Sequence, residues 1–306
     1  MKYRAQINPE LRHIAQNIPY NKAVIRCANI FQAISFRLTA VPREITHRSM
    51  AVEGYQRLKF RVELFDPSGI TEKLPCLIYV HGGAFSYRAS AYHKKLACIY
   101  AKRAMCRVYF PDYHLTPQYP YPAAYEDVLA LYRWIMENAE AFGINREKIG
   151  IAGDSVGASI AALICNNYRR ENLQRPCLQM LVYPLTDVTM QTDSMQKFSD
   201  TPLWNSKNNR RMWSYYCGHL KSEDRYSASP LHSSLPPIIP AAYIETAEYD
   251  CLHDEGLIYG EKLREAGANV EVNETKGTIH GYDFAINTKI AICNIEKRIS
   301  FLKNQF

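Results

Sequence analysis

Long apolar stretches are missing from this 306-residue sequence, and so is any dense run of charge of one sign. No segment reaches the roughly 20 apolar residues that a membrane-spanning helix needs, and the N-terminus, MKYRAQINPELRH, lacks the apolar centre of a signal peptide. The formal net charge is +7, but lysine and arginine are scattered, with pairs such as Arg169–Arg170 and Arg210–Arg211 as the tightest clusters. These absences argue against a membrane-spanning, secreted or nucleic-acid-binding protein and predict a cytoplasmic one.

Paired cysteines are also missing, because the nine cysteines form no CxxC and no spacing typical of metal ligands. The zinc motif HExxH is absent, and the histidines are dispersed along the chain. Cys76, Cys106 and Cys177 begin apolar, strand-like runs, whereas Cys98 and Cys165 lie in helix-like runs. We therefore expect reduced, mostly buried thiols and no metal site.

What is present is the pattern of a large α/β protein. Hydrophobic residues make up 47% of the chain, which is enough to bury a sizeable core. From residue 55 onward, strand-like runs such as LPCLIYV at 74–80 alternate with helical patterns such as the one at 91–105. This alternation predicts an α/β fold, with a mostly parallel central sheet and helices on both faces. Functional groups in such sheets gather beyond the C-terminal ends of the strands.

Two segments depart from the alternation. Residues 1–50 show helical spacing and no clean strand pattern, which is consistent with a lid, an oligomer contact or simple packing. Residues 186–229 are rich in aromatic side chains, including Trp204 and Trp213, and contain a predicted helix at about 206–219. We interpret the second segment as an insertion above the sheet.

One stretch, KIGIAGDSVGAS at residues 148–159, places the pattern G-x-S-x-G between a strand-like run and a helix-like run. A serine at such a junction takes a strained backbone conformation, and Gly153 and Gly157 let the strand and helix pass without a clash. Ser155 then lies at a helix N-terminus, where the helix dipole favours a developing negative charge. The pattern predicts a nucleophilic serine. The alternative is a tight glycine-rich turn with an incidental serine.

A nucleophilic serine needs a base to take its proton and a carboxylate to orient that base. In folds with this serine turn, the base and the carboxylate both come later in the chain than the serine. Asp250 follows a predicted strand at 241–246, and His280 lies in the loop GTIHG at 277–281, so we predict that they are the acid and the base. Asp250 could instead be a surface acid, and His280 a histidine bonded to the backbone. The other acids considered are Glu248, Asp254, Glu255 and Asp187, and the histidines interpreted as exposed are His219, His232 and His253.

The run HGGA, residues 81–84, follows the predicted central strand at 74–80. Acyl transfer needs hydrogen-bond donors aimed at the oxyanion of the tetrahedral intermediate, and glycine-rich backbone supplies them without side chains in the way. The alternative is a loop with two turn glycines, in which His81 braces the backbone. The predicted oxyanion donors are the backbone N–H groups of Gly83, Ala84 and Val156, joined by that of Gly82.

The set HGGAF, DYHLTP, GDSVGAS, EYDCLHDEG and GTIHGY resembles the hormone-sensitive-lipase-like family of α/β-hydrolase carboxylesterases, over roughly residues 55–300. Four positions depart from the family pattern. Ala84 replaces a third glycine, Val156 replaces an alanine, and His114 and Gln118 replace an arginine and a glutamate. The first two changes affect the width of the pocket, and the last two predict that a buried ion pair is missing.

The resemblance implies a single α/β-hydrolase domain over residues 1–306, with a helical cap over the active site built from residues 1–50 and about 186–229. It also implies hydrolysis of short- to medium-chain carboxylic esters through an acyl-enzyme, without a cofactor, and, by analogy, a homodimer formed along an edge strand. Candidate pocket walls are Phe85, Trp204 and Trp213, for which core packing is the alternative.

Two other functions stay open at this point. An amidase or a long-chain lipase would use the same Ser155–His280–Asp250 set, so the three residues alone do not separate them from an esterase. A catalytically silent ligand-binding protein on the same scaffold is disfavoured, because serine, acid and histidine are all present in matching contexts.

Overall fold

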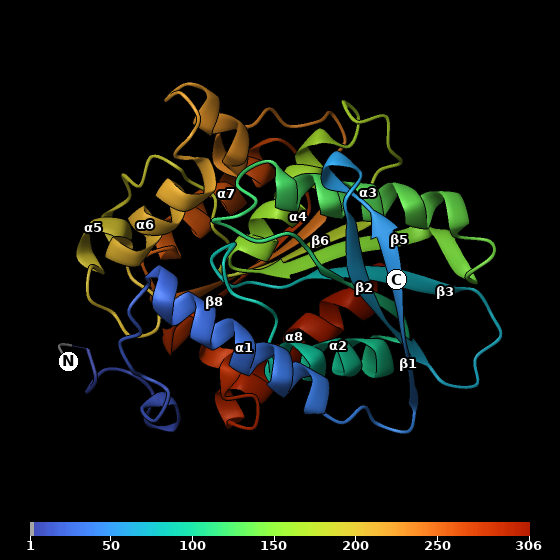
Figure 1. Ribbon diagram of the computed structural model, residues 1–306, viewed down its shortest axis with the longest axis horizontal. Helices are drawn as coiled ribbons and strands as arrows, with labels where there is room; N and C mark the ends of the chain where they lie inside the picture. The colour runs from blue at the N-terminus through green and yellow to red at the C-terminus, as the bar shows by residue number, and fades with distance from the viewer. Residues whose placement is uncertain (1–2) are drawn as a thin grey trace.

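The computed structural model describes residues 3–306, and the strands among these residues form one sheet (Figure 1). The sheet has eight strands in the order β1-β2-β4-β3-β5-β6-β7-β8. Only β1 with β2 and β2 with β4 are antiparallel pairs, so the predicted mostly parallel sheet is confirmed. The strands are β1 Ile45–Glu53, β2 Lys59–Pro67, β3 Leu74–Val80, β4 Arg107–Asp112, β5 Ile144–Asp154, β6 Leu178–Val182, β7 Ala241–Tyr249 and β8 Val270–Ile279.

Helices cover both faces of this sheet, as the alternation predicts (Figure 1). Helices α2 and α8 pack on one face, and α3, α4 and α7 pack on the other. The remaining helices α1, α5 and α6 lie beyond these two layers (Figure 1). The helices are α1 Lys22–Leu38, α2 Ala91–Ala104, α3 Ala123–Asn138, α4 Val156–Asn167, α5 Asp193–Lys197, α6 Ser206–Cys217, α7 His253–Glu265 and α8 Lys289–Gln305.

The central strand β3 shows why its sequence is apolar throughout. Successive side chains of a strand point to opposite faces. Ile78 and Val80 accordingly join the core under α3 and α4, while Leu77 and Tyr79 join the core under α2 and α8. A strand covered on both faces has no polar side, which is why LPCLIYV reads as a continuous run.

The expected boundaries were wrong at both edges of the sheet. Residues 45–53, of which those up to about 50 were expected to be helical, form β1, an antiparallel edge strand that buries only Ile45, on one face of the sheet, and Val52, on the other. So little burial leaves no apolar alternation in the sequence. At the other edge β8 runs from Val270 to Ile279, well beyond the predicted strand at 270–272, because its polar residues lie partly exposed. Residues 1 and 2 of the expected cap lie outside the described residues.

The N-terminal segment and the insertion after β6 are joined by hydrogen bonds to backbone atoms. The N–H of Leu203 donates to the carbonyl of Gln16 at 2.8 Å, and Asn208 Nδ2 donates to the carbonyl of Ile18 at 3.2 Å. Arg211 adds a third bond, to the carbonyl of residue 20, at 3.2 Å. Two parts of the chain nearly 200 residues apart in sequence are thereby held together at one end of the sheet.

Candidate active site

Ser155 occupies the sharp turn between β5 and α4. Its backbone has φ 55° and ψ −121°, a conformation that non-glycine residues rarely adopt. The glycines around it are needed for space: a Cβ on Gly157 would lie 2.1 Å from the carbonyl oxygen of Val80, and one on Gly153 would lie 2.3 Å from the carbonyl carbon of Gly157. The G-x-S-x-G spacing therefore allows α4 to start directly against β3.

Ser155, His280 and Asp250 meet in one hydrogen-bonded series. His280 Nε2 lies 2.9 Å from Ser155 Oγ, and His280 Nδ1 lies 2.6 Å from Asp250 Oδ2. The other oxygen of Asp250 accepts the N–H of Leu252 at 3.0 Å, which fixes the carboxylate. Asp250 is fully buried, and Ser155 and His280 are 6% and 9% exposed. The three side chains come from the ends of β5, β7 and β8, as expected for a parallel sheet.

The four other acids considered have different partners, and none of them contacts His280 within residues 3–306. The contacts are Glu248 with the N–H of Gly277, Asp254 with His253 and the N–H of Ser194, Asp187 with His232, and Glu255 with the N–H of Thr186. Of the histidines expected to be exposed, His219 and His232 are exposed, while His253 is partly buried beside Asp254. The packing around β7 thus leaves Asp250 alone beside His280.

The loop after β3 brings free backbone donors to the serine. Within the described residues, the N–H groups of Gly83 and Ala84 have no acceptor. Val156 is the first residue of α4, so its N–H has no intrahelical acceptor either. Gly83 and Ala84 both have positive φ, 126° and 53°, which turns the backbone of the loop sharply. A loop of this shape presents N–H groups rather than side chains to a bound molecule.

Gly82 was expected to be a further oxyanion donor, and this expectation was wrong. Its N–H already donates to Asp154 Oδ2 at 3.0 Å, so it is not available to a ligand. The same carboxylate accepts hydrogen bonds from Tyr79 and Tyr92 and lies 3.3 Å from His93 Nε2. Burial would raise the pKa of Asp154, but its positively polarised neighbours, His93 above all, lower it below the ordinary value.

This polar cluster beneath the loop was not found from the sequence. Asp154 stands inside the G-x-S-x-G stretch, and that position was the available signal. His81, which also lies here, was expected to brace its loop, and its Nδ1 contacts the carbonyl of Gly82 at 2.5 Å. Burial, and then the neighbouring His93, lower the pKa of His81 to about 3, so it is neutral at physiological pH.

A cavity of about 490 Å³ opens above Ser155 and His280. Its walls come from α1, from the loop after β3 and from residues 203–208, and they are mostly apolar and aromatic. Trp204 lines it, and its ring centre lies 6.2 Å from that of His280. Phe85 and Trp213 do not: Phe85 stacks on Tyr216 in the core, and Trp213 packs beside the same ring. Their expected place in the pocket wall was wrong.

His114 is not left without a partner. Its Nδ1 and its backbone N–H both contact Asp127 Oδ2, at 2.7 and 2.8 Å, and Asp127 is fully buried on α3. The other oxygen of Asp127 accepts the N–H of Tyr55. An acid from α3, not the residue at 118, is therefore the partner of the histidine, and the expectation that a buried ion pair is missing here stays a prediction.

The sequence also predicted free, mostly buried thiols and no metal site or membrane-spanning helix. All nine cysteines are free, and most are buried. Across residues 3–306, no three or more His, Cys, Asp or Glu side chains are grouped so that they could hold a metal ion. None of the helices in this part of the chain is both long and apolar enough to cross a lipid bilayer.

Comparison with known proteins identifies the family of this chain. The family model for the alpha/beta hydrolase fold matches residues 77–284, more than half of the chain. The chain therefore belongs to this family, and the resemblance to its hormone-sensitive-lipase-like members is confirmed.

Two curated relatives and one solved structure illustrate the likeness. Carboxylesterase NlhH of Mycobacterium tuberculosis is 29% identical over 293 residues, which cover 92% of this chain and 91% of the relative. Esterase LipI of the same species is 30% identical over 284 residues, with 90% and 88% covered. The crystal structure of esterase LipW from Mycobacterium marinum matches with a TM-score of 0.88 at 23% identity, covering 99% of this chain and 97% of that one.

Proposed function

We propose that this protein is a serine carboxylesterase that hydrolyses short- to medium-chain carboxylic esters through an acyl-enzyme intermediate. The observation that carries the proposal is the series Ser155–His280–Asp250, with hydrogen-bond distances of 2.9 and 2.6 Å, at the floor of an apolar cavity. The relatives named carboxylesterase and esterase support an ester hydrolase as the enzyme class.

In the first half of the reaction, Ser155 Oγ attacks the ester carbonyl carbon while His280 Nε2 takes the serine proton. Asp250 accepts the Nδ1–H of the ring, which sets the tautomer and stabilises the imidazolium. The tetrahedral intermediate collapses when its bond to the alkoxy oxygen breaks. His280 then delivers the proton to that oxygen, and the alcohol leaves an acyl group on Ser155.

In the second half, water takes the place of the alcohol. His280 removes a proton from the water, the hydroxide attacks the acyl carbonyl, and the bond to Ser155 Oγ breaks as the proton returns to the serine. The oxyanion of both tetrahedral intermediates is held by the N–H groups of Gly83, Ala84 and Val156. These groups are fixed before the substrate arrives, so they need no reorganisation during the reaction.

The cavity supports an apolar substrate of modest size. A volume of about 490 Å³ lies in the range of roughly 300–1,000 Å³ that is usual for small-molecule sites. Aromatic and aliphatic side chains, including Phe31 and Leu203, line it beside Trp204. We further propose that the N-terminal helical segment up to Leu38 and residues 186–229 act as the cap of a single α/β-hydrolase domain. A cytoplasmic location and a homodimer along the edge strand β8 stay predictions.

The test is hydrolysis of p-nitrophenyl esters from acetate to palmitate by the wild-type protein and by Ser155→Ala. We expect activity that declines beyond medium chains and a loss of about 10⁶-fold in kcat for the variant. Asn145→Ala, which also replaces a polar side chain with a methyl group but at the far end of β5, serves as the control and should keep wild-type rates. A maximum at palmitate would indicate a lipase instead.

The amidase alternative is tested with p-nitroanilides that carry the same acyl groups. We expect turnover of anilides to be far slower than that of esters. Wild-type protein that is folded but hydrolyses no ester would contradict the proposal. Turnover of anilides alone would then favour the amidase, and no turnover at all would favour a ligand-binding protein.

A further inference from the structure

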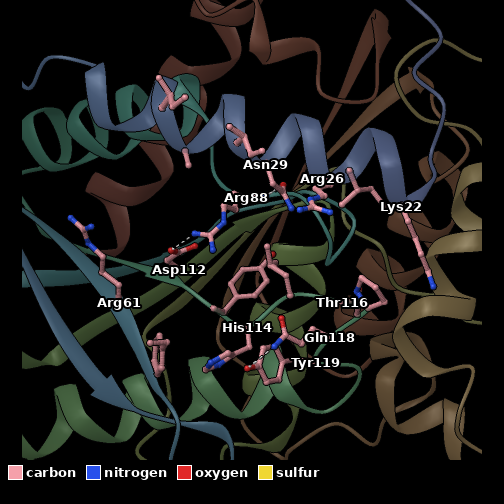
Figure 2. Close-up of a pocket in the computed structure, with 18 of the residues that line it drawn as sticks. Lys22, Arg26, Asn29, Arg61, Arg88, Asp112, His114, Thr116, Gln118 and Tyr119 are labelled. Carbon is pink, nitrogen blue, oxygen red and sulfur yellow. Dashed lines mark hydrogen bonds and ion pairs between the residues drawn. The ribbon is translucent and has the colours of Figure 1, made fainter.

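A second, larger hollow lies on the other side of α1 from the active-site cavity. It has a volume of about 820 Å³ and is walled by α1, by the start of β2 and by the loop at 112–119 (Figure 2). Helix α1 separates the two spaces: Ile25, Asn29 and Ala33 line this groove, whereas Ala28 and Phe31 line the active-site cavity. Arg88 lines both spaces, but the groove contains none of the residues proposed for ester hydrolysis.

Positive charge from three separate parts of the chain converges on this groove. The cationic side chains that line it are Lys22, Arg26, Lys59, Arg61 and Arg88. Figure 2 shows Arg26 and Arg88 reaching into the space beneath α1, across from His114 and Tyr119 on the opposite wall. One carboxylate, Asp112, lines the groove, and Arg88 NH1 lies 3.1 Å from it. The groove thus carries a clear excess of positive charge.

Most of these cations have no charge to neutralise them. Arg61 pairs with Glu63, and Arg88 pairs with Asp112. Within residues 3–306, the side chains of Lys22, Arg26 and Lys59 have neither an ion-pair nor a hydrogen-bond partner. Like charges that face one hollow repel one another and raise the local concentration of anions, so a bound anion relieves a cost that the folded chain otherwise carries.

The floor of the groove is apolar. Ile25 and Phe60 are 4% exposed, and Leu115 and Pro117 continue this surface along the loop. Apolar surface with a rim of unpaired cations suits a molecule that has both a negative head and a hydrocarbon part. Arg26 offers planar guanidinium donors of the geometry that phosphate and carboxylate oxygens accept.

We propose that the groove between α1 and the loop at 112–119 is a binding site for an amphiphilic anion, a phosphate monoester or a carboxylate with an apolar chain. Its head lies against Arg26, Lys22 and Lys59, and its chain lies on Ile25 and Phe60. Sources of this chemistry are a free phosphate monoester or fatty acid in solution and the headgroup of an anionic lipid. The site is independent of the proposed ester hydrolysis.

The test is calorimetric titration with octyl phosphate, after a covalent organophosphate has occupied Ser155. We expect one site per chain and weaker binding of inorganic phosphate, which lacks the chain. The variant Lys22→Gln/Arg26→Gln should weaken octyl phosphate binding by about tenfold or more, since hydrogen bonds to charged groups are lost. The control Arg146→Gln/Arg175→Gln removes the same charge at exposed, unpaired positions away from the groove, and its affinity should stay within about twofold of wild type.

Loss of binding to the same extent in both double variants would overturn the proposal, because it would show attraction by net charge alone. Absence of binding in the wild-type protein would overturn it as well. Failure of Ser155 to react with the organophosphate would contradict the proposed function instead, and the titration would then use untreated protein.

Sedimentation with vesicles of phosphatidylcholine, with and without phosphatidic acid, separates the two sources. Binding to acidic vesicles that is lost in Lys22→Gln/Arg26→Gln identifies the lipid headgroup. Binding of octyl phosphate without vesicle binding identifies a free anion.

Discussion

The carboxylate of Asp154 accepts the backbone N–H of Gly82 at 3.0 Å, which ties the residue before the serine to the loop that carries the free N–H groups. The space around Gly82 is equally constrained, since a Cβ there would lie 2.3 Å from the same carboxylate oxygen. The position of the donors therefore depends on a side chain outside the Ser155–His280–Asp250 series.

The variant Asp154→Asn tests this dependence. An amide keeps one acceptor oxygen but replaces the other with an NH₂ group, which cannot accept from Gly82, Tyr92 and His93 together. We expect kcat for p-nitrophenyl acetate to fall by roughly tenfold to a hundredfold, less than for complete loss of an oxyanion donor, with KM little changed. Circular dichroism should show a folded protein. An unchanged kcat would mean that the loop holds its shape without Asp154.

The orienting role proposed for Asp250 predicts a larger effect. In Asp250→Asn the imidazole loses the acceptor that stabilises its charged form, and the amide favours the wrong tautomer. We expect kcat to fall by roughly 10³- to 10⁴-fold, as in other serine triads. The matched control is Asp254→Asn, which alters an acid that contacts Ser194 and His253 instead. Equal losses in the two variants would argue against the assignment.

Gly157→Ala should lower the free energy of unfolding, in addition to any effect on catalysis. The new Cβ would lie 2.1 Å from the carbonyl oxygen of Val80, a backbone atom that moves only with β3. Overpacking of this kind costs about 1–3 kcal/mol or more in the free energy of unfolding, which urea denaturation measures. Gly260→Ala in α7 is the control, since its Cβ would meet the ends of side chains instead of backbone, the nearest being that of Ile244 at 3.1 Å. It should be close to neutral.

Glu255 gives stability a pH dependence. Burial, and then the charge of Asp187, raise the pKa of this carboxyl well above its ordinary value of 4.5. Because the folded-state pKa is raised, the contribution of Glu255 to stability is complete below about pH 4.5 and is lost as the pH rises through the folded-state pKa.

The variant Glu255→Gln has no carboxyl group to ionise at this position, so it should not lose this stability as the pH rises. Its amide oxygen still accepts the N–H groups of Thr186 and Asp187, which Glu255 Oε1 accepts at 2.6 and 3.2 Å. We expect the Tm of the variant to exceed that of wild type by a margin that grows with pH, as measured by thermal melts from about pH 5 to about pH 9. Glu265→Gln, at an exposed position of α7, should show no such trend. A margin that shrinks with pH would refute the argument.

The sequence predicted the parts of the molecule that follow from periodicity and backbone chemistry. Strand β3, the turn at Ser155 and the loops of Asp250 and His280 lie where the pattern indicated. Edge strand β1 escaped prediction because an edge strand with few buried residues carries no apolar alternation.

The errors within the site have a different cause. Gly82 and Ala84 look alike in sequence, but only the structure shows that the N–H of Gly82 is used by Asp154. Phe85 and Trp204 are both aromatic residues near the serine, and which of them faces the cavity depends on tertiary packing. The convergence of cations on the groove is likewise invisible in a chain where lysine and arginine are scattered.

The residues proposed for catalysis and the residues that shape the cavity come from separate parts of the chain. Ser155, Asp250 and His280 stand on loops of the sheet, whereas much of the wall comes from α1 and from residues 203–208. We expect mutations in these two segments to reshape the space above Ser155 without moving these three side chains. Laboratory evolution of new substrate preference should therefore succeed with small libraries confined to residues 18–35 and 203–208, and the same separation explains how such a scaffold can diversify its substrates while its chemistry stays constant.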